Sequence, residues 1–437
     1  MRTREIFRLW LPLAVSFELM MLEGPVIQGA IGRLSAPSLN LAAWGLTMSL
    51  SLLVESPVIM LLASAIALVK DRQSFFALRK FTLLLSAFCT VLTAAVAFTP
   101  LFGYIAVQLM KQPLPIVEAA QPAMQIMLLW TAAIAWRRFY QGVLVSHNRT
   151  RVVSWGTAIR LLAAIVAAVF AQKSGRFSGV QVGGIAIMAA VVIEVIATTI
   201  FAGPVVEGEV LLKHDPDKPV LTQNAIWKFH APLAATTLLT LLANPLTATA
   251  LGRLPEKGHT LAAWPVVGML LLVIRGWGLA LQEITVSQAR NPESARATVK
   301  FTWIVGIVSS VATVVFVFTP LLSWYMNSVS KVPVDIQEYV RLGMIVGMAL
   351  PMITALGSWA RGLLVAHGRT KEVYTGMGVN LSVHTSLLVI SVLCKIPGMV
   401  MAPLAMTVAA LSEYVFLRVK STRRGGDHAG AGLPASG

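Results

Sequence analysis

The sequence predicts an all-α membrane protein with twelve transmembrane helices in two parallel six-helix repeats. Composition, long apolar segments and an internal duplication support this prediction. Of the 437 residues, 56% are hydrophobic and 12% are charged, whereas soluble proteins carry about 25% charged residues. The mean hydropathy is +0.75, which excludes a water-soluble enzyme, a disordered chain and a nucleic-acid-binding protein. The net charge of +16 therefore indicates basic loops at a membrane face rather than a polyanionic partner.

Twelve segments are long and apolar enough to cross a bilayer, for which a helix needs about 20 residues. They are residues 7–31, 41–69, 81–109, 119–145, 152–171, 180–203, 227–251, 261–289, 301–329, 336–365, 373–394 and 398–418. Their apolar residues are continuous rather than alternating, which favours helices over the strands of a membrane barrel. We therefore expect a helical protein that crosses the membrane twelve times.

The two halves of the chain match at one fixed shift, here called the repeat offset, which places Gly142 on Gly362. The longest match joins Gly-Val-Leu-Val-Ser-His-Asn-Arg-Thr (142–150) to Gly-Leu-Leu-Val-Ala-His-Gly-Arg-Thr (362–370). Polar loop residues shared at a single offset indicate a duplication rather than a chance likeness of apolar segments. Because each copy holds an even number of spans, we expect the copies to be related by an axis along the membrane normal, with a cleft between them.

The duplication and the basic residues together predict the domain organisation and the topology. We expect an N-terminal six-helix bundle (1–203), a cytoplasmic linker (204–225), a C-terminal six-helix bundle (226–420) and a disordered cytoplasmic tail (421–437). With the N-terminus in the cytoplasm, 24 Lys and Arg residues fall in or beside cytoplasmic segments and nine fall on the opposite side. This asymmetry predicts that both termini are cytoplasmic. The expected location is the plasma membrane, or the inner membrane if the chain is bacterial.

Ionisable residues inside the spans are candidates for the substrate or ion pathway, because burying them costs several kcal/mol unless they are paired or reach water. Glu55 and Arg275 occupy equivalent positions in spans 2 and 8. We hypothesise that they face each other across the cleft, and pair in one conformation and part in another, as a gate or substrate site. A permanent structural ion pair is the alternative. The other candidates in the spans are Glu18, Glu23, Arg160, Glu283, Asn244 and Asn380.

The signs of these charges suggest roles for them. Arg160 and Arg275 favour an anionic group on the substrate. A carboxyl group in a drying cavity can bind and release a proton, so Glu18, Glu23 and Glu55 are candidates for proton coupling, with sodium as the alternative ion. In addition, Glu194 and Glu413 lie at nearly equivalent positions, in spans 6 and 12.

The repeated loops hold His147, Arg149, His367 and Arg369. We interpret these residues as structural, since they lie in turns at helix ends. A proton relay or a metal site at the two histidines is the less favoured alternative, because no further ligands surround them in the sequence. No catalytic motif or phosphate loop is present. We therefore expect neither an enzyme, nor a cofactor, nor a metal.

The segment Gly-Ala-Ile-Gly-Arg-Leu-Ser-Ala-Pro-Ser-Leu-Asn-Leu-Ala-Ala-Trp-Gly-Leu (29–46) resembles the junction between the first two spans of multidrug and toxic compound extrusion (MATE) transporters, and residues 249–264 repeat the pattern. The resemblance implies a MATE-like fold within the multidrug/oligosaccharidyl-lipid/polysaccharide (MOP) exporter superfamily, whose members are export carriers or lipid flippases. Residues 41–46 and 142–147 are also similar to the progressive ankylosis branch, which is associated with organic-anion and pyrophosphate export. MATE drug exporters often carry an aspartate in span 1 where this chain has Val26 and Ile27.

Together these features predict a secondary active exporter of small organic ions or drugs, working by rocking-bundle alternating access and coupled to a proton or sodium gradient. The alternatives are an organic-anion or pyrophosphate exporter, a flippase for lipid or lipid-linked oligosaccharide, and a carrier of the major facilitator type. Asp71-Arg72 lies where the last of these has its signature, without the glycines of that signature. The expected partners are membrane lipid, the substrate ion and the coupling proton or sodium, with no nucleic acid, and the chain is expected to be a monomer.

Overall fold

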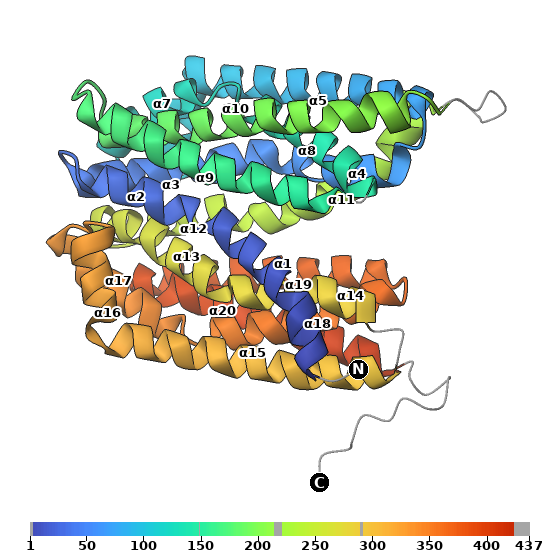
Figure 1. Cartoon of the computed structure of the whole chain (residues 1–437). Coiled ribbons are helices and arrows are strands. Elements are labelled where there is room, and N and C mark those ends of the chain that lie inside the picture. Colours follow the sequence, from blue (N-terminus) through green and yellow to red (C-terminus); the bar gives the residue numbers. More distant parts are fainter. Residues whose placement is uncertain (1–2, 148, 214–220, 289–291, 424–437) are drawn as a thin grey trace, which may run out of the picture. The chain divides into compact units, whose positions relative to one another are not determined.

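A computed structural model of the chain describes all residues except 1–2, 148, 214–220, 289–291 and 424–437 (Figure 1). The described residues form helices and no strand. This follows from the continuous apolar segments, because a helix pairs its backbone groups within itself and needs no water to satisfy them.

The first half of the chain contains ten α-helices and two π-helical segments among the described residues. They are α1 (Thr3–Met21), α2 (Glu23–Gly32), α3 (Pro37–Ile59), α4 (Leu61–Leu68), α5 (Arg72–Phe98), α6 (Leu101–Gly103), η1 (Tyr104–Leu109), α7 (Leu114–Ile126), α8 (Trp130–Ser146), α9 (Thr150–Lys173), α10 (Gly179–Val205) and η2 (Val206–Val210).

The second half repeats this order. Its described elements are α11 (Gln223–Leu241), α12 (Ala243–Leu251), α13 (Lys257–Leu279), α14 (Leu281–Gln288), α15 (Pro292–Phe318), α16 (Pro320–Trp324), η3 (Tyr325–Val329), α17 (Val334–Val346), α18 (Leu350–Ala366), α19 (Thr370–Cys394) and α20 (Gly398–Arg423). The break between α3 and α4 at Met60 recurs between α13 and α14 at Ala280, which are equivalent positions at the repeat offset found in the sequence.

Eleven of the twelve expected spans are long and apolar enough to cross a membrane in the described part of the chain. The twelfth is the segment of α7 and α8, whose counterpart Val334–Ala366 does qualify. It carries Arg137 and Arg138 where the counterpart has Gly357 and Ser358. The predicted all-α fold with twelve membrane helices is therefore confirmed.

The duplication extends to the backbone conformation. Of the seven described residues with positive φ, six form pairs at the repeat offset, which are Ala36 with Glu256, Lys111 with Lys331, and Gly175 with Lys395. The seventh is Gly368, whose counterpart lies outside the described residues. A left-handed conformation costs an L-residue about 1–2 kcal/mol. Because side chains as different as alanine and glutamate share it, the turn geometry has been retained where the sequence identity has not.

The chain divides into two compact units, each of which combines parts of both repeats. Unit 1 contains residues Met1–Met21, Val267–Tyr325 and Glu338–Gly437, and unit 2 contains Leu22–Val266 and Met326–Gln337. This division is based on contacts between residues in the structure. The predicted boundaries 1–203, 204–225 and 226–420 are based on the sequence repeat, which the division by contacts does not test, so they stay a prediction. Most of the tail predicted at 421–437 and part of the linker lie outside the described residues.

In unit 1, α1 is held by aromatic packing against helices of the second repeat. Trp10 Nε1 donates a hydrogen bond to the Trp277 carbonyl at 3.2 Å, and its ring meets Phe301 edge-on at 5.3 Å between centroids. Ile6 and Ala14, on the same side of α1, are fully buried. The first helix is therefore an integral part of unit 1.

In unit 2, α11 is held against α3 and α4 by a buried histidine. His230 Nε2 lies 2.8 Å from the Pro57 carbonyl and its Nδ1 lies 2.9 Å from Ser64 Oγ. A neutral imidazole satisfies both contacts, by donating to the carbonyl and accepting from the hydroxyl. α11 is the repeat counterpart of α1, so each repeat contributes its first helix to a unit built largely from the other repeat.

We expect His230→Leu to lower the free energy of unfolding by about 1–3 kcal/mol, because it leaves the buried Pro57 carbonyl without its donor. Thermal unfolding of the detergent-purified protein measures this loss. His259→Leu is the control, since the His259 side chain is half exposed. Equal melting temperatures for the two variants would contradict the prediction.

Candidate functional site

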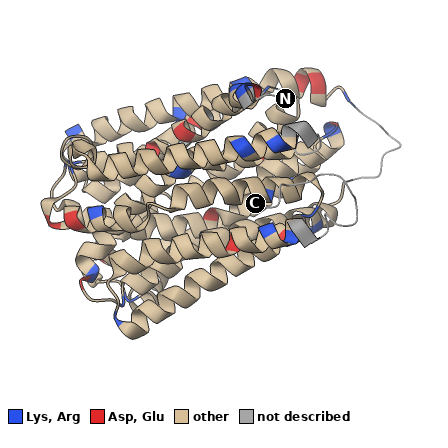
Figure 2. Cartoon of the chain, turned by 90° about the horizontal axis from the view of Figure 1, so that it is seen from below, with Lys and Arg blue, Asp and Glu red and all other residues tan. Residues whose placement is uncertain are grey.

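Most charged positions lie near helix ends, and a smaller number lie within the helices (Figure 2). In unit 2 the internal charges come from five helices. They are Glu23 on α2, Glu55 on α3, Arg137 and Arg138 on α8, Arg160 on α9 and Glu194 on α10. Charges removed from water are tolerated when they are paired and hydrogen-bonded. The hydrogen bonds of each acid in this group therefore show whether it is already held by an arginine or can still accept a new partner.

Glu194 is the centre of this cluster and is completely buried. Its Oε2 accepts hydrogen bonds from Arg137 Nη1 at 2.6 Å and from Arg160 Nη1 at 3.4 Å. Its Oε1 accepts from Gln141 Nε2 at 3.2 Å. One carboxylate thus joins α8, α9 and α10.

Glu23 is held by the other edge of the Arg160 guanidinium. Arg160 Nε donates to Glu23 Oε1 at 3.0 Å, and Arg160 Nη2 donates to Oε2. This two-point geometry is the strong form of an arginine–carboxylate pair. Glu23 is the first residue of α2, after the helix break at Leu22.

Glu55 differs from the other two acids. Its side chain is buried, and among the described residues its Oε2 has no hydrogen-bond partner. Its electrostatic neighbours are Arg138, Arg137, Arg160 and Glu23. Glu55 is therefore the carboxyl group of this cluster that can take a proton or change its partner without breaking a hydrogen-bonded ion pair.

Unit 1 contains the repeat counterpart of the Glu194 arrangement. Glu413 on α20 accepts two hydrogen bonds from Arg361 on α18, at 2.6 and 2.8 Å, and one from Asn380 on α19 at 2.8 Å. Arg361 and Asn380 are the repeat counterparts of Gln141 and Arg160. The carboxylate therefore joins equivalent helices in both repeats. The charge of the donors differs, because a charged Arg361 replaces the neutral Gln141 and a neutral Asn380 replaces the charged Arg160.

Arg275 on α13 is a further cation of this second cluster. Its Nη1 lies 3.6 Å from Met406 Sδ, and its Nε has no hydrogen-bond partner among the described residues. Its electrostatic neighbours are Arg361 and Glu413. Because Glu413 is already bonded to Arg361, this cluster of two arginines and one carboxylate has an excess of one positive charge.

The remaining residues expected in a pathway lie outside these two clusters. Glu18, near the end of α1 in unit 1, is half-buried, and its carboxyl group packs against Gly276. Glu283 is exposed on α14, and Asn244 is half-buried on α12. Glu55 belongs to unit 2 and Arg275 to unit 1, so the hypothesis that they pair stays a prediction.

The repeated loops have the same geometry twice. His147 Nδ1 lies 2.9 Å from the Val143 carbonyl, and His367 Nδ1 lies 2.8 Å from the Leu363 carbonyl. These contacts cap the last turns of α8 and α18, and the structural role of the two histidines stays a prediction. Within the described residues there is no group of three or more His, Cys, Asp or Glu side chains that could hold a metal ion.

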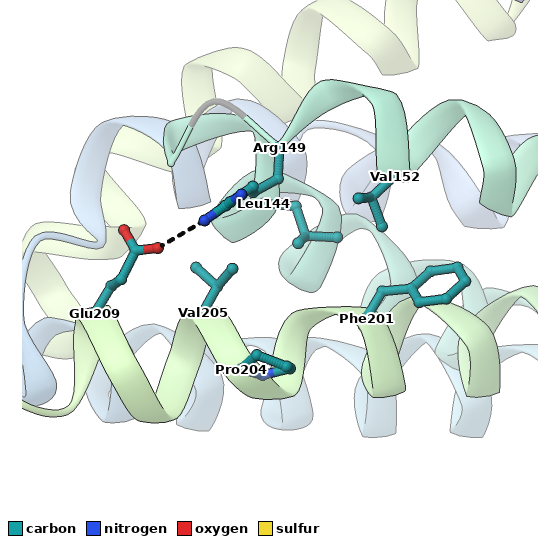
Figure 3. Close-up of a pocket in the computed structure, with 7 residues that line it drawn as sticks. All are labelled: Leu144, Arg149, Val152, Phe201, Pro204, Val205 and Glu209. Carbon is teal, nitrogen blue, oxygen red and sulfur yellow. Dashed lines mark hydrogen bonds and ion pairs between the residues drawn. The ribbon is translucent and has the colours of Figure 1, made fainter.

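Each of the two loop arginines contacts groups of its own repeat. Arg369 Nε donates to Glu372 at 3.1 Å and Arg369 Nη2 donates to the Lys420 carbonyl at 3.1 Å. Arg149 forms an exposed ion pair with Glu209 at 3.5 Å (Figure 3). This pair lies over an open pocket lined by Leu144, Arg149, Val152, Phe201, Pro204, Val205 and Glu209. Exposed ion pairs contribute at most about 1 kcal/mol, so the pair is a minor contact.

Sequence reasoning missed Arg137, Arg138 and Arg361, which it assigned to cytoplasmic segments. The structure places Arg137 in the buried middle of α8 and Arg361 beside Glu413. A signal was available for the first two, because two adjacent arginines follow the apolar segment 126–136 and are followed by another apolar segment. Arg361 stands alone near a helix end and gives no such signal.

Several solved transporters have the same fold as this chain. The chain is similar to a multidrug resistance MATE family transporter of the MOP superfamily in an inward-facing conformation, with a TM-score of 0.73, 15% identity, and coverage of 94% of this chain and 96% of that one. It is similar to the lipid II flippase MurJ in an inward closed conformation, with a TM-score of 0.71, 12% identity, and coverage of 94% and 87%.

A third similar structure is a MOP superfamily transporter from Pyrococcus furiosus, described as having a binding pocket of reverse polarity that suggests a different function. Its TM-score is 0.66 at 15% identity, with coverage of 96% of this chain and 95% of that one. No protein-family model and no curated protein matches the sequence. The chain is thus a multi-pass membrane protein with the fold of MATE transporters.

Proposed function

We propose that the chain is a secondary carrier that moves a small organic anion across the membrane by alternating access. The observation that supports this proposal is Arg275, a cation within a membrane helix whose neighbouring carboxylate, Glu413, is already bonded to Arg361. A cation removed from water without an anionic partner is unfavourable. Binding of an anionic substrate group supplies the missing partner.

The balance of charge in the two clusters favours an anion over a cationic drug. In unit 2, Glu23, Glu55 and Glu194 balance Arg137, Arg138 and Arg160. A cationic substrate would need an acid free of arginine, and two of these three acids are hydrogen-bonded to arginine. The excess charge of the second cluster is positive.

Glu55 is the residue that we assign to ion coupling. Because its Oε2 has no hydrogen-bond donor among the described residues, uptake of a proton there breaks no existing bond. Glu23 is unsuited to this role, since protonation would break the two-point bond to Arg160. A proton gradient is therefore the proposed driving force, and sodium is the alternative ion.

Transport assays in proteoliposomes test the function. We expect uptake of mono- and dicarboxylates or organic phosphates, and we expect Arg275→Gln to reduce it about 10- to 100-fold, as for the loss of a hydrogen bond to a charged group. Arg275→Lys should retain part of the activity because it keeps the charge. Arg296→Gln is the matched control, since Arg296 is exposed on α15.

Two outcomes would overturn the proposal. One is anion uptake by Arg275→Gln at the rate of the unmodified protein. The other is a carrier that moves organic cations and no anion. In the same vesicles, Glu55→Gln should make anion movement independent of an imposed pH gradient. If anion movement by this variant still depends on the pH gradient, a residue other than Glu55 carries the coupling.

A flippase for an anionic lipid headgroup is the second candidate. It is favoured by the likeness to a lipid II flippase over 94% of this chain, and an arginine would serve equally to bind a lipid phosphate. Fluorescent phospholipids and lipid-linked sugars in the same vesicles separate the two candidates. Translocation of lipid, with no movement of soluble anions, would favour the flippase.

A further inference from the structure

Two arginines at equivalent positions each bind a backbone carbonyl of the other repeat, and all of these residues belong to unit 2. Arg33 Nη2 donates to the Val329 carbonyl at 2.7 Å, and Arg253 Nη2 donates to the Leu109 carbonyl at 2.6 Å. At the repeat offset, Arg253 is the counterpart of Arg33, and Val329 is the counterpart of Leu109. The contact is therefore made twice, with the roles of the two repeats exchanged.

The carbonyl acceptors are available because helices end there. Leu109 is the last residue of η1 and Val329 is the last residue of η3, and the final carbonyls of a helix have no partner within it. Shortly after these helix ends, Lys111 and Lys331 take left-handed conformations with φ of 54° and 50°, which turn the chain away. A cation at the negative end of a helix is favourable as well.

A glycine before each arginine allows this approach. A Cβ on Gly252 would lie 2.6 Å from the Met110 carbonyl oxygen, and a Cβ on Gly32 would overlap the carbonyl oxygens of Ser330 and Lys331. The Gly-Arg pair is thus needed at both places for physical reasons, with glycine giving room for the backbone and arginine binding it.

Two further hydrogen bonds strengthen the same region without a repeat counterpart. Ser38 Oγ donates to Asp335 Oδ2 at 2.9 Å, and Gln112 Nε2 donates to the Ala248 carbonyl at 2.8 Å. They join the same two pairs of segments as the arginine contacts do.

We propose that these reciprocal contacts form a clasp, made of Gly32, Arg33, Leu109–Lys111, Gly252, Arg253 and Val329–Lys331, that closes the carrier at the membrane face where α2 and α12 end. The clasp is a two-state element that releases as a whole. Its two halves are related by the pseudo-twofold symmetry of the repeats, as in an isologous interface, so a rotation that separates one half separates the other. The proposal rests on the carrier function proposed above, which requires this side to open once per cycle.

The first test measures opening without any substrate. Ser330 is buried in the clasp, and its hydroxyl has no hydrogen-bond partner among the described residues, so Ser330→Cys is a mild probe. In a background with Cys89→Ala and Cys394→Ala, we expect a water-soluble maleimide to label this cysteine in nanodiscs about tenfold faster after Arg33→Gln with Arg253→Gln, since each removes a hydrogen bond to a charged group. Arg176→Gln, at an exposed arginine outside the clasp, should leave the rate unchanged. Equal labelling in the double variant and the control would overturn the clasp.

The second test asks whether the clasp opens during transport. The side chains of Ser38 and Asp335 touch, so Ser38→Cys with Asp335→Cys in the same background should allow a disulfide across the clasp. We expect the disulfide to stop anion uptake and a reductant to restore it. Continued uptake by fully cross-linked protein would overturn the proposal. Faster labelling in the first test, in a protein that moves no anion, would support the clasp and contradict the proposed function.

Discussion

Replacing Glu194 with alanine is expected to destabilise the protein by about 3–5 kcal/mol, as for removal of one partner of a buried ion pair. The carboxylate is fully buried and accepts from Arg137, Arg160 and Gln141. Arg137 has no other ion-pair partner among the described residues, and its side chain is 5% exposed. Its charge would stay buried without compensation.

The repeat supplies a matched comparison. Glu413→Ala removes the equivalent carboxylate, but the side chain of its arginine, Arg361, is 23% exposed and can reach water more readily. We therefore expect a larger fall in melting temperature for Glu194→Ala than for Glu413→Ala, with Glu194→Gln between Glu194→Ala and the unmodified protein. Fluorescence-detected size-exclusion after heating measures all three. A Glu194→Ala protein that melts at the same temperature as the unmodified protein would show that the buried cluster does not stabilise unit 2, and one that melts together with Glu413→Ala would contradict the predicted difference.

Replacing Gly142 with leucine is expected to disrupt the packing of α8 on α4. A Cβ at Gly142 would lie 2.7 Å from the Leu62 carbonyl oxygen and would overlap Ala65 Cβ. Overpacking a well-filled site costs about 1–3 kcal/mol, and a whole leucine side chain against backbone should reach the upper end. Small residues allow such close helix crossings in membrane proteins.

The same crossing occurs in the second repeat, where a Cβ at Gly362 would lie 2.7 Å from the Gln282 carbonyl oxygen. Gly362→Leu should therefore reduce folded yield and melting temperature as Gly142→Leu does. Gly203→Leu is the control, since Gly203 on α10 faces open space. Equal yields for Gly142→Leu and Gly203→Leu would contradict this account of the repeated glycine.

Most of the fold could be predicted from sequence because the bilayer restricts the choice of structure. A continuous apolar segment must become a helix to satisfy its backbone, and polar loop identities at one offset expose a duplication. Both signals can be read from the order of residues in the chain, without knowing which segments pack together. The twelve spans followed from them, including the segment of α7 and α8 that carries the buried Arg137 and the half-buried Arg138.

The charge clusters depended on contacts that no local pattern records. Glu23 bonds to Arg160 because α2 packs against α9, and Arg361 reaches Glu413 because α18 packs against α20. The exchange of α1 and α11 between the units is likewise a matter of packing, since either helix is apolar enough to bury against several neighbours.

The sequence by itself determined that this protein is helical, that it spans the membrane and that it consists of two copies of one six-helix repeat. Those properties depend on hydropathy and on residue identity at a fixed offset. Only the tertiary structure decided which buried charges are paired, which carboxyl oxygen and which guanidinium lack a partner, and that Arg33 and Arg253 bind each other's repeat. The physical reason is that ion pairs and hydrogen bonds depend on separations of a few ångströms between residues far apart in the chain, and packing sets those separations.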